Sequence, residues 1–320
     1  MKKLTWDIKI GRCRLAALKG VTVQASVLNL SDTAVIELPA RRFGRQTEVR
    51  DNIAVGDEVT ISLGYDGDNA LEFSGFVKRI GREKESLKVE CEDALYLLRK
   101  SVVDKEYKDV TLKALLSDVL SQVDGGLTVD VVTAYDMKYD KFVTFHATAL
   151  DVLKKVHDDT KADIWFEGRT LHIKPVYGKP EGDEAVTFDP LVNMQANDLK
   201  WVDSRDKNVE VEVRFRMPDG TVKKETFGTS GGEKIVKYVD SAETKTLKEA
   251  AENEHNMWNY SGYEGDFTAW LVPRVKAGGT VRLRDTERKE DARYYVTGVE
   301  IEFGQNGAKR KVKLGMKLTR

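Results

Sequence analysis

The 320-residue sequence predicts an α+β protein that is mainly β, with a small α/β domain between two β regions. Three observations support this prediction. Apolar and polar residues alternate in short runs over the first hundred residues, helical spacing appears between about 105 and 178, and alternation then returns. We therefore expect domains at 1–104, 105–178 and 179–320.

The composition is that of a folded, soluble globular protein, because hydrophobic residues make up 41% and charged residues 33%. Lys and Arg number 52 against 53 Asp and Glu, a formal net charge of -1. This balance argues against a dedicated nucleic-acid-binding protein, which usually carries a basic excess. Arg41, Arg42 and Arg45 could still form a local basic patch, although a solvated basic loop is the simpler interpretation.

The two cysteines and the first residues indicate where the protein is made. Cys13 and Cys91 both lie in strand-like runs, so buried reduced thiols are the first expectation and one disulfide is the alternative. The start, MKKLTWDIKI, has lysines but no apolar stretch behind them, and no long apolar run follows later. We expect a protein that is made in the cytosol and stays soluble unless other machinery moves it.

The first β region consists of short runs separated by turn residues. Its clearest alternating apolar positions are Val59, Ile61 and Leu63, and then Leu87, Val89 and Cys91. This period is typical of half-buried strands, and such a series at short spacing favours a barrel or a sandwich. Gly75 interrupts the run EFSGFVKRI, and a glycine inside a strand indicates a bend or a close backbone approach.

The middle region has helix start signals at two places. Thr111 can cap a helix that ends before Gly125 and Gly126, and Thr148 with Asp151 forms a capping-box pair ahead of a second helix. A strand-like run follows each helix. This order predicts a small α/β domain.

The second β region begins with the alternating run VEVEVRFRM and a Pro-Asp-Gly turn at 218–220, which is a strong hairpin signal. Thr246 and Glu249 then form a capping box for a helix at about 247–259, ending before Gly262. Four further strand-like runs complete the chain.

The two β regions resemble each other near their ends. GDEVTISLGY, FSGFVKRI and SLKVEC are echoed by GGTVRLRD, VTGVEIEF and RKVKLGM. Aligning Gly75 with Gly298 places Val89 beside Val312, each 14 residues beyond its glycine. We interpret the echo as two related β domains, with a bend at each glycine.

No motif in the sequence indicates catalysis or metal binding. Ser230 lies in a literal G-x-S-x-G, but the run that follows is strand-like, which predicts a hairpin loop instead of a nucleophile turn. His157 is best explained as a contact at a helix end, and a metal site shared by His146 and His172 is the weaker alternative to ordinary histidines. We therefore assign no catalytic, cofactor-binding or metal-binding residue. The five tryptophans are read first as core residues: Trp6, Trp165, Trp201, Trp258 and Trp270.

The order of these runs resembles the baseplate hub proteins of contractile phage tails, the late-control-D type family, and is similar to the hub portion of spike proteins in related injection machines. The resemblance is carried by loose motifs over nearly the whole chain: DTAVIELP, VTISLGYDG with EFSGFVKRI, TLKALLSDVL, ATALDVLKKVHDDTKADIWFEGRTLHIKP, the helix near 247–259, and AGGTVRLRD with YYVTGVEIEFG.

The resemblance implies two related tube-protein-like β-barrel domains per subunit, a homotrimeric ring in the virion tail or injection-machine baseplate, and a structural role without a cofactor. Its implied partners are the tail tube, other baseplate proteins and a separate spike, because the chain stops at Arg320 without a spike barrel or needle. Two alternatives stay open: a carbohydrate- or surface-binding β-module, and a baseplate-associated hydrolase with an unrecognised carboxylate pair.

Overall fold

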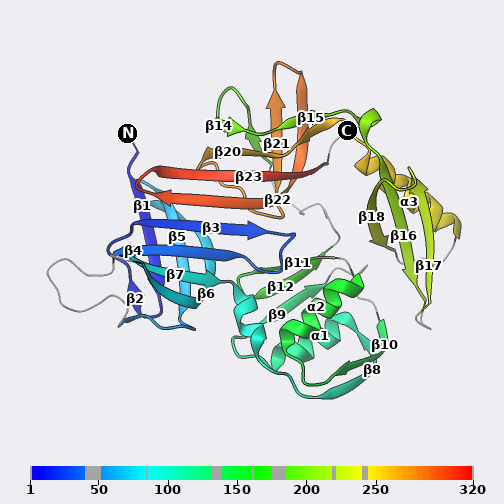
Figure 1. Cartoon of the computed structure of the whole chain (residues 1–320), viewed down its shortest axis with the longest axis horizontal. Coiled ribbons are helices and arrows are strands. Elements are labelled where there is room, and N and C mark those ends of the chain that lie inside the picture. The colour runs from blue at the N-terminus through cyan, green and yellow to red at the C-terminus, as the bar shows by residue number, and fades with distance from the viewer. Residues whose placement is uncertain are drawn as a thin grey trace.

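The computed structural model describes most of the chain, and it is mainly β with antiparallel sheets (Figure 1). The described residues are 2–39, 52–83, 86–131, 138–160, 162–174, 185–217, 221–239 and 244–318. Arg41, Arg42 and Arg45, and the predicted turn at 218–220, lie outside them.

The first β region forms the strands that its alternation predicts. They are β1 (Leu4–Ile10), β2 (Cys13–Arg14), β3 (Gly20–Ser26), β4 (Thr33–Pro39), β5 (Glu58–Tyr65), β6 (Asp68–Glu83) and β7 (Ser86–Glu92). The apolar positions of β5 and β7 are buried, so the predicted inward face is confirmed. Both cysteines are free thiols, with Cys91 buried and Cys13 half-buried.

The middle region folds around a core of its own, which also includes Ala94, Leu95, Leu98 and Val102 from before the expected boundary at 105. Its elements are a 3-10 helix η2 (Ala94–Arg99), β8 (Lys105–Thr111), α1 (Leu112–Ser121), β9 (Thr128–Val131), β10 (Lys138–Thr144), α2 (Ala149–Thr160), β11 (Asp163–Glu167) and β12 (Thr170–Lys174). Both predicted caps are present: Thr111 Oγ1 accepts from the Ala114 amide at 3.2 Å, and Thr148 and Asp151 bond reciprocally.

The last region contains more than the predicted strands and helix. Its elements are β13 (Val186–Phe188), β14 (Met194–Asn197), β15 (Lys200–Val202), the 3-10 helix η4 (Ser204–Asp206), β16 (Val209–Arg216), β17 (Val222–Gly228), β18 (Glu233–Tyr238), α3 (Thr244–Trp258), β19 (Gly262–Glu264), β20 (Asp266–Trp270), β21 (Thr280–Asp285), β22 (Glu290–Gly304) and β23 (Gly307–Lys317). β16, β17 and β18 form a separate sheet that packs α3, a third small core that the sequence did not predict. α3 begins three residues before the predicted 247.

Both β regions belong to one 13-stranded sheet with one shared core among the described residues. The two regions join where β22 pairs with β3 (Figure 1). The expected pair of separate barrels is therefore not confirmed.

The sheet nevertheless contains the same strand order twice. One path runs β1-β5-β6-β7-β4-β3, and the other runs β13-β21-β22-β23-β20-β14. The order along the chain also agrees, because the last two strands of each path, β3 with β4 and β14 with β20, come before β5–β7 and β21–β23 in the sequence. One difference is that β1 lies antiparallel to β5 whereas β13 lies parallel to β21. We call these two sets the first unit and the second unit.

Backbone hydrogen bonds fix which residues of the two units correspond. The Val77 amide donates to the Asp57 carbonyl at 2.9 Å, and the Val296 amide donates to the Gly279 carbonyl at 3.0 Å. Each valine carbonyl in turn accepts from a glycine amide, Gly56 or Gly278, at 2.8 Å. Val77 and Val296 therefore occupy equivalent positions.

This correspondence confirms half of the predicted echo. Val89 opposes Ile80, and Val312 opposes Val299; these partners lie three residues beyond Val77 and Val296 respectively, so Val89 and Val312 match as expected.

The glycine half of the echo is wrong by four residues. Gly75 corresponds to Tyr294, and Gly298 corresponds to Arg79. The β22–β23 pair extends further toward its turn than the β6–β7 pair does. The stretch of chain between equivalent residues of the two hairpin strands is therefore longer in the second unit. Counting back the same number of residues from Val89 and from Val312 then reaches positions that are not equivalent.

Candidate assembly interface

The joint between the two units is a seven-pair antiparallel ladder. It runs from Gly298 opposite Ser26 to Gly304 opposite Gly20. The side chains that it turns toward the core are buried: Val21, Val23, Ile301 and Phe303. Inside one chain, the second half of β22 is thus covered by β3, the strand at the end of the first unit's path.

The equivalent half of β6 is open. β6 leaves β5 near Phe76, and residues 79–82 then pair only with β7. No strand among the described residues pairs with their other side. Arg79 and Arg82 are exposed, and Ile80 is half-buried. We call residues 79–82 the acceptor edge.

The second open edge lies along β14 and β15. These strands pair with β20 and β19 just as β3 pairs with β4, but no described strand covers their other side. Met194, Leu199 and Trp201 are only half-buried against the main core. Residues 196–202 are called the donor edge.

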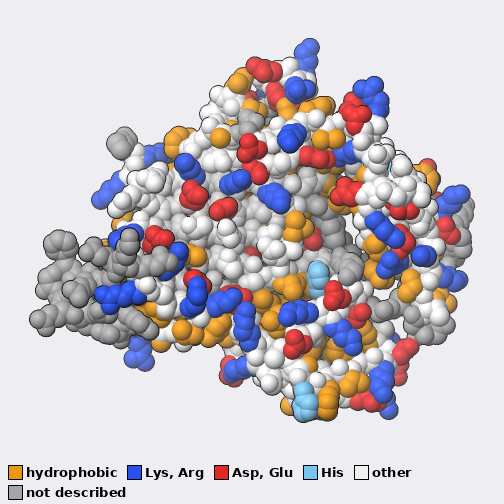
Figure 2. All heavy atoms as spheres, viewed as in Figure 1, with side chains coloured by type: hydrophobic (Ala, Val, Ile, Leu, Met, Phe, Trp, Pro, Cys, Tyr) orange, Lys and Arg blue, Asp and Glu red, His pale blue; other side chains and the backbone are white. Residues whose placement is uncertain are grey.

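The solvent face of the sheet carries both signs of charge, and Figure 2 shows acidic and basic side chains interspersed on the viewed face. Arg79 binds Glu90 through two bonds of 2.9 and 2.5 Å, which lowers the pKa of Glu90. Lys311 lies 3.0 Å from Asp266, which raises the pKa of Lys311. On this face Arg79 and Lys311 are thus each paired with a neighbouring carboxylate.

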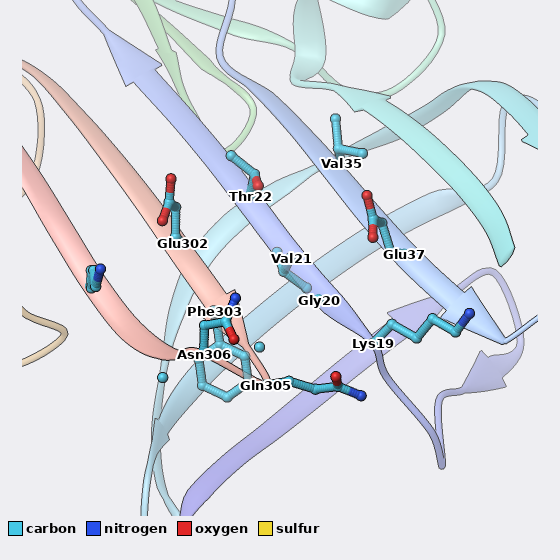
Figure 3. A pocket seen from close by; sticks show the side chains of 13 residues that line it. Lys19, Gly20, Val21, Thr22, Val35, Glu37, Glu302, Phe303, Gln305 and Asn306 are labelled. Atoms are coloured by element: carbon cyan, nitrogen blue, oxygen red, sulfur yellow. The ribbon is translucent and has the colours of Figure 1, made fainter. Parts of the chain in front are cut away.

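A groove of about 580 Å³ lies over the joint on this face (Figure 3). Thr22, Glu37, Glu302 and Gln305 line it from β3, β4, β22 and the turn after β22. Lys19 at its end donates to Ser86 Oγ at 2.6 Å. These are ordinary solvated side chains on a sheet surface, and the groove is open to water.

The interior of the sheet holds a buried ion pair that sequence reasoning missed. Arg310 on β23 is 1% exposed, and its guanidinium donates to Glu72 on β6 at 2.7 Å. The same group donates to the carbonyls of Leu271 at 3.2 Å and Val275 at 2.8 Å. The available signal was an arginine at an inward position of an otherwise alternating strand. The pair ties the second unit to the first.

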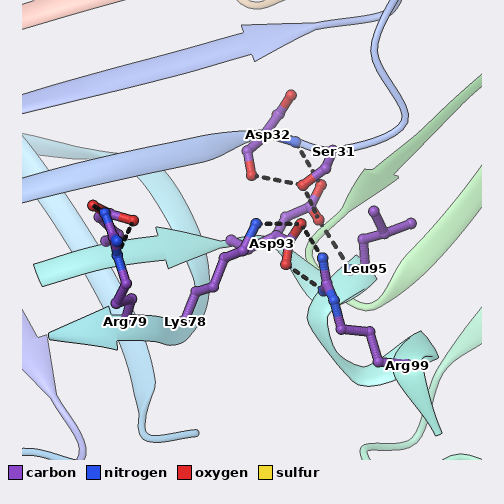
Figure 4. Close-up of polar contacts among 9 residues, drawn as sticks. Ser31, Asp32, Lys78, Arg79, Asp93, Leu95 and Arg99 are labelled. Carbon is purple, nitrogen blue, oxygen red and sulfur yellow. Dashed lines mark hydrogen bonds and ion pairs between the residues drawn. The ribbon is translucent and has the colours of Figure 1, made fainter. Parts of the chain in front are cut away.

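A second buried polar cluster marks the exit from the first unit toward the middle region (Figure 4). The Asp93 carboxylate accepts from the Asp32 amide, the Ser31 hydroxyl and the Leu95 amide, at 2.9 to 3.2 Å. It therefore caps η2 and holds the β3–β4 turn at the same time. Burial raises the pKa of Asp93 to about 7 and that of Asp32 to about 6.

We expect the variant D93N to flatten the pH dependence of stability. A carboxyl whose pKa is raised by folding binds its proton more tightly in the native state, so its contribution is complete below its unfolded pKa and declines as pH rises toward 7. Each pKa unit corresponds to about 1.4 kcal/mol. Urea unfolding at pH 4.5 and 7.5 should show that the stability of D93N relative to wild type improves at the higher pH. An unchanged difference would contradict the assignment.

The structure does not bring together the serine and histidines that the sequence offered as candidates for catalysis or metal binding. Ser230 lies in the turn between β17 and β18, so it links two strands, as expected, and not a strand to a helix. The predicted hairpin is wrong, because β17 and β18 lie on opposite sides of β16 and each pairs with β16. His146 contacts Asp104, whereas His172 contacts Asp130 at 3.1 Å and stacks on Trp165. His157 lies near Asp158 at the end of α2. Within the described ranges, no group of three or more His, Cys, Asp and Glu residues is arranged to hold a metal ion.

The tryptophans lie on different elements. Trp6 and Trp201 pack against the main core, Trp258 packs against the third core, and Trp270 is exposed. They do not form the exposed aromatic cluster that a sugar-binding surface would present. In the described part of the chain, no helix is long and apolar enough to cross a membrane.

Solved structures with the same fold include tail proteins. A tail protein from Neisseria meningitidis MC58 superposes with a TM-score of 0.64 at 15% identity, covering 98% of this chain and 96% of that chain. The 43 kDa tail protein of prophage MuSo2 from Shewanella oneidensis gives a TM-score of 0.64 at 12% identity, with coverage of 98% and 97%.

An Escherichia coli component of the type VI secretion system, described as structurally similar to T4 bacteriophage tail proteins, gives a TM-score of 0.59 at 9% identity, covering 98% of this chain and 76% of that chain. No protein-family model and no curated protein matches this sequence. The chain therefore has the fold of these tail proteins, as its resemblance to late-control-D type hub proteins predicted.

Proposed function

We propose that this protein is a structural baseplate hub of a contractile phage tail or a related injection machine. In this role it forms a trimeric ring that joins the tail tube to a separate central spike. The function needs no catalytic group, and assembly through strand edges and docking surfaces is sufficient.

The observation that carries the proposal is the repeated strand order within one chain. Three copies of a chain with two equivalent units present six similar units around a ring. Such a ring can meet a sixfold tube on one side, while its three chains match a threefold spike on the other. The tail-protein fold supports the same conclusion. The middle region, at about 105–178, would lie outside the ring as a decoration, because its core is separate from that of the sheet.

Native mass spectrometry and cryo-microscopy of the purified protein test this proposal. We expect a trimer and a threefold ring with a central opening. A tight dimer, or a protein that stays monomeric at high concentration and beside its spike, would contradict the hub assignment.

We expect the ring to have no tight affinity for duplex DNA. The acidic side chains Glu300 and Glu302 on β22 lie beside the basic Lys309 and Lys311 on β23, so a passing phosphate backbone meets no net attraction. Fluorescence anisotropy with a labelled duplex at low salt measures this. Submicromolar, salt-sensitive binding would contradict the prediction.

A charge-reversed variant provides the matched control for this measurement. Replacing Glu300 and Glu302 by lysine leaves a basic row on two neighbouring strands, and we expect this variant to gain salt-sensitive DNA binding. The gain would show that the assay detects a basic surface at this position.

A further inference from the structure

The joint inside the chain provides a template for a contact between chains. In the joint, β3 of the first unit covers the second half of β22 in the second unit. The equivalent half of β6 is the acceptor edge (79–82), which is open, and the equivalent of β3 is the donor edge (196–202), which is open as well. Each subunit thus contains the β3–β22 pairing once, and it carries the two equivalent edges a second time without a strand partner among the described residues.

The register of the unused pairing follows from the equivalences. Ile36 opposes Val89, and Phe267 opposes Val312. Because Val89 and Val312 are equivalent, Ile36 is equivalent to Phe267. Thr33 and Glu264, each three residues earlier, are then equivalent as well. Their partners across the next strand pair are Gln24 and Lys200, which therefore correspond too.

On the acceptor side, Glu300 lies four residues beyond Val296, and Gly81 lies four residues beyond Val77. Gln24 opposes Glu300 inside the chain. The equivalent contact between chains places Lys200 opposite Gly81, and Trp201 opposite Ile80.

The side chains at the two edges fit this contact. Ile80 and Trp201 are apolar, and both are left half-buried in the single chain. Their equivalents in the joint, Val299 and Ala25, lie opposite each other, and Val299 is 6% exposed. Pairing the edges would cover apolar surface and satisfy a row of backbone groups that otherwise face water.

We propose that the donor edge of one subunit pairs with the acceptor edge of the next, antiparallel, with Lys200 opposite Gly81. The occupant of each open edge is a second copy of this chain. The contact is heterologous, so it closes only as a ring, and it rests on the proposed hub function.

Disulfide trapping tests the register. In a C13S background, the double variant G81C with K200C should form a covalent trimer under oxidation and nothing larger. Both sites tolerate the change, because a Cβ at Gly81 meets no atom nearer than 4.0 Å and Lys200 is exposed. A mixture of the two single variants should give covalent dimers only, since each chain then carries one half of a contact.

The joint itself supplies the positive control. The double variant Q24C with E300C should cross-link within one chain and leave its mass that of a monomer. The edge pairing is overturned, and the hub function is not, if the protein is a native trimer, the Q24C–E300C disulfide forms, and the G81C–K200C disulfide does not. Absence of any trimer would overturn both, and covalent chains longer than three would contradict ring closure.

Discussion

The variant R310L should lose about 3–5 kcal/mol of unfolding free energy, the range measured when one partner of a buried ion pair is removed. The Glu72 carboxylate would remain buried at 6% exposure, with Arg274 3.6 Å away as its nearest described cation partner. The carbonyls of Leu271 and Val275 would lose their donors as well. Urea unfolding followed by circular dichroism measures the loss.

Two further variants separate burial from charge. K311M removes an exposed ion pair with Asp266 from the same strand, and we expect a change below about 1 kcal/mol. The double variant R310L with E72L removes both buried charges and should recover much of the stability that R310L loses. Equal losses in R310L and K311M would show that the Arg310 pair does not hold the two units together.

The variant G75A should be the most damaging single-methyl change in the sheet among these tests. A Cβ at Gly75 would lie 2.2 Å from the Glu92 carbonyl oxygen and 2.8 Å from the Phe73 ring, and a backbone atom cannot move aside as a flexible side chain can. Overpacking of this kind lowers stability by about 1–3 kcal/mol, and we expect the upper end of that range.

G81A is the matched control, since it lies on the same strand and its added Cβ would lie 4.0 Å from the nearest atom. We expect G81A to unfold at nearly the wild-type urea concentration, with G75A clearly below it. Similar midpoints for the two variants would mean that the close approach at Gly75 does not constrain the fold.

Local features could be predicted from the sequence. The caps at Thr111 and Thr148 depend on residues three positions away, and the strands β5 and β7 show their buried faces through alternation. Such signals lie within one element. Their physical basis is the period of the helix or strand itself, so no knowledge of distant partners is required.

Long-range pairing could not be predicted in the same way. The joint brings Gly20 opposite Gly304, and nothing in either strand names its partner across so much of the chain. The predicted glycine echo failed for a related reason. The register shifts of the two hairpins lie beside Val77 and Val296, and nothing in the sequence distinguishes these two valines from other core valines.

The same limit explains the missed polar residues. Arg310 occupies an inward strand position where a hydrophobic residue is expected, and its partner Glu72 lies in the other half of the sequence. Asp93 directly follows a strand, where the sequence does not distinguish a buried capping residue from an ordinary turn residue. Both are recognisable only once the partners that satisfy them are placed.

The two units differ most at the connection between β3 and β4 and its equivalent between β15 and β19, which we call the tip. A short turn, residues 27–32, links β3 to β4, whereas residues 203–261 lie between the equivalent β15 and β19 and contain α3 with its three-stranded sheet. The strand pairing on both sides of the tip is nevertheless preserved. This tip is therefore a natural graft point, where the fold has accepted a self-contained module without altering its sheet. Inserting a foreign domain between Leu28, which is exposed, and Asn29 would exploit the same tolerance. It would keep Leu30 against the core of the middle region and the Asp32 contact with Asp93 in place.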